Sequence, residues 1–338
     1  MAEEIISPIS YEDLAAIEDD FAEVDDEILR KQYELSKPLF AKRNDAISKI
    51  PNFWPLVMEQ APLEIEEYIK SADSAIFGEH LVNLSVIRPE IEDGKYGSPK
   101  SVSIKFEFSK NDHFSDETLE KHCWYRRTSD GWSGLVSEPV KIHWKKDKDL
   151  TDGLTDAAVA LFEARRKVGD MSATGLPEYK ALEKKVENWN GGNTSFFTWF
   201  GWVSSQRFVS AEESEKADKV YAARKDARKR GEKTGVTEAP RDEDEDDEQQ
   251  DDSAVEVHQA GEEIAYTITD DIWPNAIKFF TQAQEDEAMS DADMEDLDDE
   301  DAGEGDDVPI DIRSLVQGKE NGRSRDSGGP PPAKRVKK

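Results

Sequence analysis

The sequence predicts an α+β protein: a long N-terminal dimerisation helix, then a domain with an antiparallel four-stranded sheet and helices, then a disordered acidic tail. Three observations predict it. Apolar residues recur at spacings of three and four between residues 14 and 35, four later segments carry apolar residues at every second position, and two runs are almost pure carboxylate. A spacing near 3.5 is typical of a coiled-coil helix, and a period of two is typical of a strand with one buried face.

A narrow apolar stripe follows the first helix, which we expect over residues 11–48 with a length of about 50 Å. Lys31 interrupts the stripe, and Pro38 should kink the helix or move Lys37 out of the helical conformation. A second copy of the same helix would bury the stripe; packing on the helix's own domain is the alternative. The predicted dimerisation residues are Leu14, Ile17, Phe21, Val24, Ile28 and Leu35.

The formal net charge of −32 is concentrated in two runs. Residues 242–252 hold nine carboxylates and residues 285–307 hold fourteen, with no basic residue in either. A field of this sign repels nucleic acid and anionic membranes and attracts basic proteins. We therefore expect a basic protein partner, although such runs can also serve solubility alone.

The sequence offers no strong catalytic or metal site, so we expect no enzyme activity, no cofactor and no metal. Cys123 is the only cysteine. Because neighbouring residues of a strand point to opposite faces, Cys123 and His122 would not converge on one ligand. Asp270 and Asp271 could form an acid/base pair, but helix capping explains them better. Without a signal peptide or a long apolar run, we expect an intracellular, soluble chain with no membrane contact.

Four strands are predicted, joined by short connections into an antiparallel meander. Val82, Leu84 and Val86 mark the first strand, and residues 102–108, 119–127 and 136–144 supply the others. Two helical segments follow within residues 154–189, separated by a break from Gly169 to Pro177.

Later segments alternate between apolar and charged patterns. Residues 211–233 predict a basic helix, which could be an import signal, a DNA contact or, as we favour, a partner for the adjacent acidic run. Ile264, Tyr266 and Ile268 alternate with Ala265 and Thr267, as in a strand. Asp270 and Asp271 should cap a following helix with Pro274 in its first turn and with Ile277 and Phe280 facing inward.

Three motifs resemble the nucleosome assembly protein family in its SET-type branch. They are the helix end Lys42-Arg43-Asn44-Asp45-Ala46-Ile47-Ser48-Lys49-Ile50-Pro51-Asn52-Phe53-Trp54, the aromatic segment Ser195-Phe196-Phe197-Thr198-Trp199-Phe200, and Asp270-Asp271-Ile272-Trp273-Pro274-Asn275 before an acidic tail. The resemblance covers about residues 10–150, 193–203 and 262–307. Residues 151–190 and 204–258 depart from the pattern and are interpreted as insertions.

The resemblance implies a homodimer on an antiparallel helix pair, with each subunit carrying an "earmuff" domain. The domains expected are a flexible N-terminus at 1–10, the dimerisation helix at 11–48, the earmuff domain at 49–283 and the disordered acidic tail with a basic C-terminus at 284–338. The implied function is a histone chaperone that assembles nucleosomes without ATP. Alternatives are a protein phosphatase inhibitor, an activity of the SET-type branch, and a general acidic scaffold.

The resemblance also suggests where partners would bind. Core histones, either H3–H4 or H2A–H2B, should meet the sheet edge and the loops near 193–203 and 262–275, with nucleic acid contacted only indirectly or through the basic insert. The predicted histone-binding residues are Glu262, Glu263, Asp270, Asp271, Asp298, Asp299, Glu300 and Asp301.

A basic C-terminal motif predicts a nuclear protein that shuttles to the cytoplasm. Its import residues are Lys334, Arg335, Lys337 and Lys338.

Overall fold

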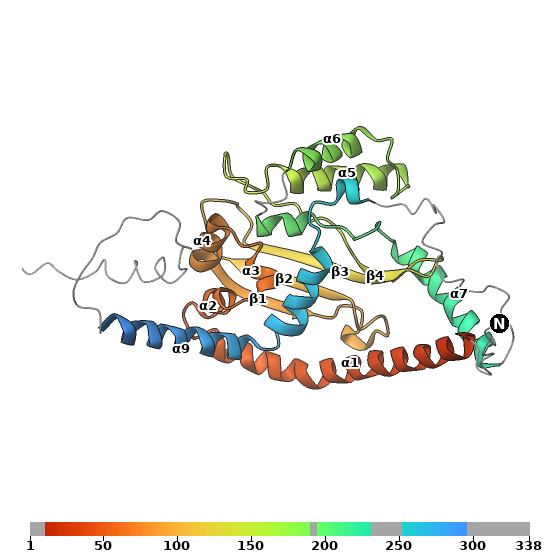
Figure 1. Cartoon of the computed structure of the whole chain (residues 1–338), viewed down its shortest axis with the longest axis horizontal. Coiled ribbons are helices and arrows are strands. Elements are labelled where there is room, and N and C mark those ends of the chain that lie inside the picture. The colour runs from red at the N-terminus through yellow and green to blue at the C-terminus, as the bar shows by residue number, and fades with distance from the viewer. Residues whose placement is uncertain (1–10, 190–194, 231–251, 296–338) are drawn as a thin grey trace, which may run out of the picture.

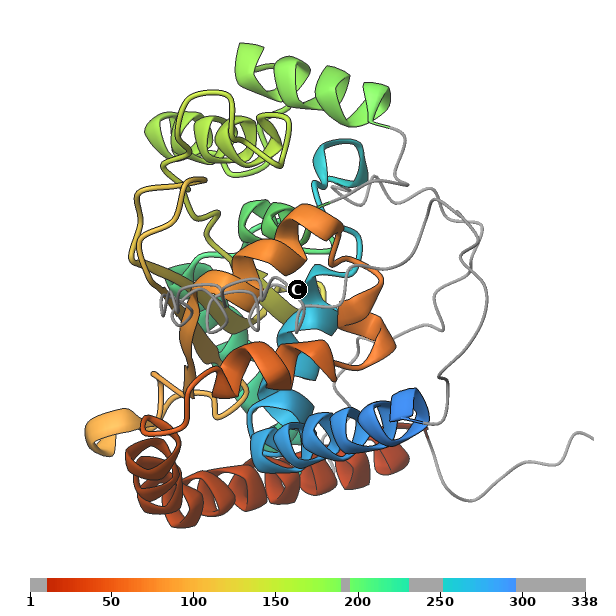
Figure 2. The same ribbon diagram turned by 90° about the vertical axis from the view of Figure 1, so that its left-hand side faces the viewer.

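The long helix and the four-stranded sheet predicted from the sequence are both present in the computed structural model (Figure 1). The structure describes residues 11–189, 195–230 and 252–295. The sheet lies between the first helix on one side and a helical pair, α5 and α6, on the other (Figures 1 and 2). The predicted α+β class is therefore confirmed.

Helix α1 spans Tyr11–Ile47 and continues through Pro38 instead of ending there. Three short helices then lead into the sheet: α2 (Phe53–Glu59), α3 (Leu63–Glu66) and α4 (Ser71–His80). Several of their apolar residues, among them Trp54 and Ile65, are buried in the main core, as expected from the sequence.

The four strands form one antiparallel sheet in the order β1-β2-β3-β4. Alternation places Leu84, Ile104 and Phe106 on the core face, as predicted. Val82 was expected beside them, but its side chain is 60% exposed, because the register shifts between Leu81 and Asn83. The strands are β1 (Leu81–Ile87), β2 (Val102–Phe108), β3 (Thr118–Arg127) and β4 (Ser133–Ser137); a short turn, η1 (Glu92–Gly94), follows β1.

The prediction of the fourth strand at residues 136–144 was wrong in its position. Pro139 has no backbone N–H and cannot continue a ladder in the middle of a strand. From the last residue of β4 onward the chain pairs elsewhere: the N–H of Ser137 donates to the carbonyl oxygen of Val203 at 2.6 Å, and that of Val140 donates to the carbonyl oxygen of Phe200 at 2.8 Å. The sheet is thereby joined to the aromatic segment.

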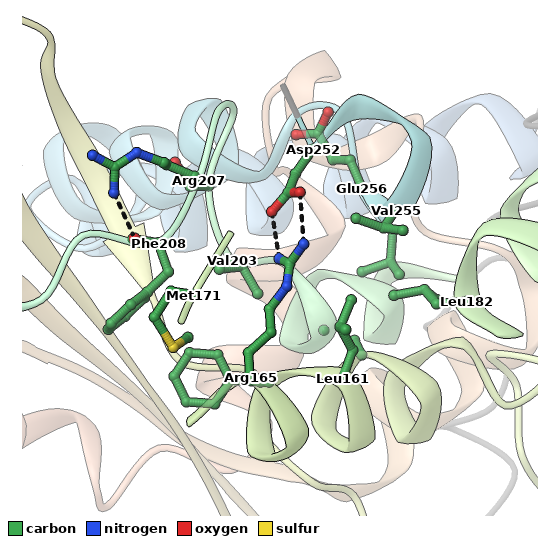
Figure 3. A pocket seen from close by; sticks show the side chains of 15 residues that line it. Leu161, Arg165, Met171, Leu182, Val203, Arg207, Phe208, Asp252, Val255 and Glu256 are labelled. Atoms are coloured by element: carbon green, nitrogen blue, oxygen red, sulfur yellow. Dashed lines mark hydrogen bonds and ion pairs between the residues drawn. The ribbon is translucent and has the colours of Figure 1, made fainter. Parts of the chain in front are cut away.

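Helices α5 (Leu154–Val168) and α6 (Pro177–Asn188) form the predicted pair with the predicted break. They enclose a second apolar cluster together with η3 (Ser253–Val255). Arg165 on α5 and Asp252 form a two-pronged ion pair at 2.6 and 2.9 Å in the wall of a small cavity at this junction (Figure 3). This pair fixes Asp252, the first residue of the described range 252–295, to α5. The predicted Gly191-Gly192 hinge lies outside the described residues.

The remaining described elements are η2 (Phe196–Gly201), α7 (Ala211–Lys229), α8 (Gly261–Tyr266), η4 (Thr267–Ile272, a π-helix) and α9 (Ala276–Glu295). The strand-like reading of residues 264–268 was wrong. Ile264, Ile268 and Ile272 are buried four residues apart, which is helical spacing. Ile277 was also misplaced, since its side chain is 56% exposed while Phe279 is buried.

Candidate functional site

The six predicted dimerisation residues lie along one side of α1. Each is at least half exposed in the single chain, from 50% for Leu14 to 63% for Phe21. Leu39, which the sequence analysis did not include, continues the stripe and is 66% exposed. The stripe therefore does not pack on its own domain, which was the alternative expectation. Dimerisation stays a prediction.

A different side of α1 holds its own domain. Arg30 donates to the carbonyl oxygen of Gly97 at 2.5 Å, and Tyr33 and Lys37 both donate to the carboxylate of Glu92. The three donors follow one another at spacings of three and four, so they share a helix face. The loop between β1 and β2 is thus attached to α1, and the apolar stripe is left uncovered.

Helix α7 attaches to the N-terminal half of α1. Lys225 contacts the Glu23 carboxylate at 2.5 Å and the backbone oxygen of Asp19 at 3.0 Å, and Arg228 contacts the Asp19 carboxylate at 3.2 Å. Tyr221 also donates to Asp19. These cations of the predicted basic helix bind carboxylates of α1; a pairing with residues 242–251 lies outside the described residues.

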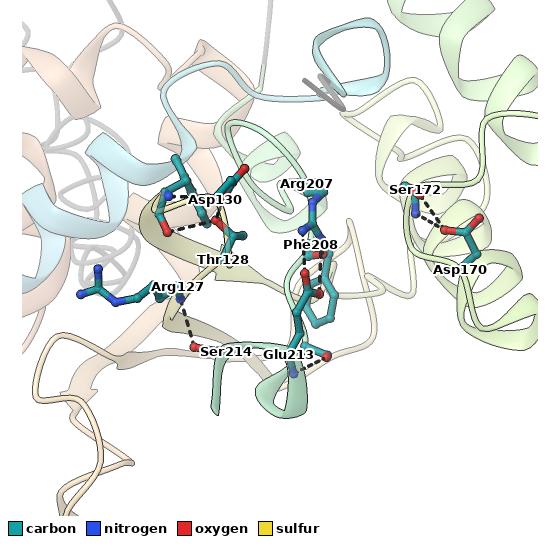
Figure 4. A network of polar contacts seen from close by, with 11 residues as sticks. Arg127, Thr128, Asp130, Asp170, Ser172, Arg207, Phe208, Glu213 and Ser214 are labelled. Atoms are coloured by element: carbon teal, nitrogen blue, oxygen red, sulfur yellow. Dashed lines mark hydrogen bonds and ion pairs between the residues drawn. The ribbon is translucent and has the colours of Figure 1, made fainter. Parts of the chain in front are cut away.

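The first turns of α7 are fixed to the sheet by polar contacts (Figure 4). The backbone N–H of Arg127 at the end of β3 donates to the Ser214 hydroxyl at 3.0 Å. Glu213 accepts two bonds from Arg207, at 2.6 and 3.3 Å. Helix α7 therefore connects the sheet to α1 with contacts at both of its ends.

The predicted histone-binding carboxylates have different surroundings. Glu262 accepts a bond from the backbone N–H of Leu135 at 3.1 Å and so covers an edge donor of β4. Glu263 is exposed. Asp298, Asp299, Glu300 and Asp301 lie outside the described residues.

Asp270 and Asp271 do not cap α9, contrary to the prediction. Both lie within the π-helix η4, and α9 begins only at Ala276. Asp270 forms an ion pair with the buried Arg88 at 3.2 Å, and Asp271 accepts from the Asn275 side chain at 2.9 Å. Burial lowers the pKa of Arg88, and the Asp270 charge opposes that shift.

The aromatic motif is a structural element and offers no surface. Residues 196–201 are all buried and cannot themselves contact a partner, whereas histone contact elsewhere in 193–203 stays a prediction. Ser195 accepts the N–H of Phe197 at 3.1 Å and donates to Asp73 at 2.6 Å. Burial raises the pKa of the Asp73 carboxyl, and the bond from Ser195 partly offsets this.

Lys121 is a buried residue that sequence reasoning missed. Its ammonium group donates to the carbonyl oxygens of Phe200 and Trp202 at 3.2 and 2.8 Å, and it is fully buried. Burial lowers its pKa to about 7. The signal was available, because Leu119, Lys121 and Cys123 occupy one parity of a strand whose other members are core residues.

Candidate chemistry at His122 and Cys123 is not supported by their positions. Cys123 is fully buried, and burial raises the pKa of its thiol to about 11. His122 is exposed and stacks on Trp124 with ring centroids 5.5 Å apart. Within residues 11–189, 195–230 and 252–295, no three His, Cys, Asp or Glu side chains gather as metal ligands would. In the same ranges no helix is long and apolar enough to cross a membrane.

Comparisons with known proteins converge on one family. Residues 10–283 match the family model described as nucleosome assembly protein. A Schizosaccharomyces pombe protein provisionally named as a nucleosome assembly protein is 36% identical over 152 residues, which cover 42% of this chain and 59% of that relative. NAP1-related protein 2 of Arabidopsis thaliana is 29% identical over 211 residues, covering 60% of this chain and 68% of the relative.

A SET protein and two solved structures are also similar to this chain. Protein SET of Drosophila melanogaster is 30% identical over 132 residues, covering 37% of this chain and 45% of that protein. The crystal structure of the Vps75 histone chaperone aligns with a TM-score of 0.47 and 19% identity, over 80% of this chain and 97% of that one. Ccp1 aligns with a TM-score of 0.46 and 25% identity, over 81% and 95%.

Proposed function

Because this chain belongs to the nucleosome assembly protein family, we propose that it is a homodimeric histone chaperone that works without ATP. The observation that carries the proposal is the family match over residues 10–283, followed directly by fourteen carboxylates in residues 285–307. A folded domain of this family therefore carries a long anionic segment at its C-terminal end.

The uncovered stripe of α1 supports the dimer. Seven large apolar side chains on one helix, from Leu14 to Leu39, are each half exposed or more. Burying half of such a side chain stabilises an interface by about 1 kcal/mol. The stripe would then provide several kcal/mol of dimer stability, and the domains would be held on a common helical base.

The anionic segments would act by occupying cationic histone surfaces before DNA does. Free histones bind phosphates non-specifically through counterion release. A chaperone that covers the same charges leaves only those transfers in which the DNA geometry competes successfully. Exposed carboxylates such as Glu263 would orient the cargo, while the 285–307 run, including Asp298 to Asp301, would supply salt-sensitive attraction.

The basic C-terminus supports a nuclear location. Lys334, Arg335, Lys337 and Lys338 form a cationic cluster behind three prolines. A chain lacking 334–338 should stay in the cytoplasm; accumulation in the nucleus would assign import to the 224–233 block. Inhibition of a protein phosphatase is a further activity that the same acidic surface could serve, and it stays a prediction.

Histone binding by the full-length chain tests the proposal. Purified core histones are titrated into the protein at increasing salt, without ATP, and compared with a variant whose acids in 285–307 are replaced by the matching amides. A variant amidated only in 242–251 is the control. We expect the first variant to bind more weakly but measurably; a complete loss would reduce the function to charge attraction by the tail.

A further inference from the structure

A cleft opens between α1 and the π-helix η4. Its volume is about 350 Å³. Leu29 and Phe40 of α1 and Val86 of β1 give it apolar walls, and Thr269 and Trp273 line the opposite side. The cleft is thus bounded by α1 and by the motif of residues 270–275.

Two buried polar groups in this wall have no hydrogen-bond partner among the described residues. They are the Thr269 hydroxyl and the indole N–H of Trp273, on side chains that are only 6% and 5% exposed. Buried polar groups are nearly always bonded, because leaving one unsatisfied costs free energy. Both groups can donate, so the cleft suits a ligand that brings acceptor oxygens.

The charge of Asp270 at the opening of the cleft sets a second requirement for a ligand. Asp270 keeps 58% of its side chain exposed although it pairs with the buried Arg88. Its carboxylate can therefore accept a further cation from outside. The π-helical turn that presents Thr269 and Asp270 is a rare conformation that occurs frequently at functional sites.

We propose that this cleft binds residues 308–316 of the same chain. The segment reads Val-Pro-Ile-Asp-Ile-Arg-Ser-Leu-Val and holds five aliphatic residues in a tail that is otherwise almost entirely polar. In an extended conformation, Ile310 and Ile312 share one face and can contact the apolar walls. The backbone carbonyls supply acceptors for Thr269 and Trp273, and Arg313 supplies the cation for Asp270.

The chain is long enough for this return. Helix α9 begins at Ala276, beside the cleft, and its twenty residues carry the chain about 30 Å away. The thirteen residues from 296 to 308 can span about 43 Å when extended. Docking of 308–316 would close the intervening carboxylates into a loop anchored at both ends. This inference does not depend on which cargo the protein binds.

Disulfide trapping in the full-length chain tests it. Gln32, which lines the cleft and is exposed, is changed to Cys together with Ser314→Cys; the matched control pairs Gln32→Cys with Ser324→Cys. The buried Cys123 stays out of reach. We expect the 32–314 bond to form within one chain at least ~10-fold faster than the 32–324 bond, because docking raises the effective concentration.

Changing Ile310 and Ile312 to Ser in the 32–314 chain should remove that advantage while leaving the folded domain untouched. Equal rates for the two cysteine pairs, or rates insensitive to the isoleucine changes, would overturn the proposal. A bond that forms mainly between two chains would overturn the same-chain assignment and identify the second copy as the source. Hydrogen exchange over residues 29–40 should also rise in the isoleucine variant; unchanged protection there would contradict docking.

Discussion

The ammonium group of Lys121 on β3 donates to the backbone carbonyl of Trp202 at 2.8 Å, which joins the sheet to the residue that follows η2. A second bond, to Phe200, and the nearby faces of Trp199 and Trp202 complete its surroundings. The buried Lys121 side chain therefore bonds the aromatic motif to the sheet from within the core.

Lys121 should make stability depend on pH. Its pKa is about 7 in the folded chain and near 10.5 when unfolded, so between these values the unfolded state binds the extra proton. Stability should therefore rise with pH from 7 to 9, by at most about 1.4 kcal/mol per pH unit from this group. Urea unfolding of Lys121→Met should lack this part of the slope.

The exposed Lys141 provides the control for that experiment. Lys141→Met should keep the wild-type slope. If Lys121→Met and Lys141→Met respond to pH alike, the buried ammonium is not the cause.

The apolar stripe should set the oligomeric state. Asp at Leu14, Ile17 and Ile28 places charges at the seam and should convert the dimer to monomers in light scattering. Leu63→Asp changes a residue that is 75% exposed on α3, away from the stripe, and should leave the mass unchanged. A triple variant that keeps the wild-type mass would refute the assignment of this stripe as the dimer interface.

Much of the fold followed from periodicity, and its failures have physical causes. The strand patterns of residues 102–108 and 119–127 were sufficient because each has one buried face. Pro139 ended the fourth strand early, and its continuation paired with the 200–203 backbone, a contact that no local pattern encodes. The short apolar run at 264–268 fits both periods, and packing against the core decided for the helix.

The site was harder to predict than the fold. Neighbouring acidic residues have different surroundings. Glu262 accepts a hydrogen bond from a backbone N–H of the edge strand β4, while Glu263 is exposed to solvent. The docking of α7 on α1 joins residues about two hundred positions apart, so it required the tertiary structure. Sequence alone identified the basic helix but not its partner.

Glu262 and Glu263 should separate stability from binding. Glu262→Ala leaves the Leu135 N–H without its acceptor and should lower the free energy of unfolding by about 1–2 kcal/mol. Glu263→Ala should leave unfolding unchanged and weaken histone binding by about twofold, since it removes one exposed charge. Calorimetry for both quantities checks the pair, and an inverted pattern would show that the roles are misassigned.

The contact of α7 should protect the N-terminal half of α1. Lys225→Ala removes contacts to Asp19 and Glu23 worth about 1 kcal/mol, which corresponds to about fivefold faster amide exchange over residues 15–25. Lys219→Ala breaks only an exposed pair within α7 and should change nothing in α1. Equal exchange in the two variants would mean that α7 does not hold α1.

Sedimentation of the full-length chain with core histones, at about 0.15 M salt, tests the central claim most directly. We predict a particle that contains two copies of this chain together with bound histones, formed without ATP. A single chain that sediments alone beside free histones would contradict the account.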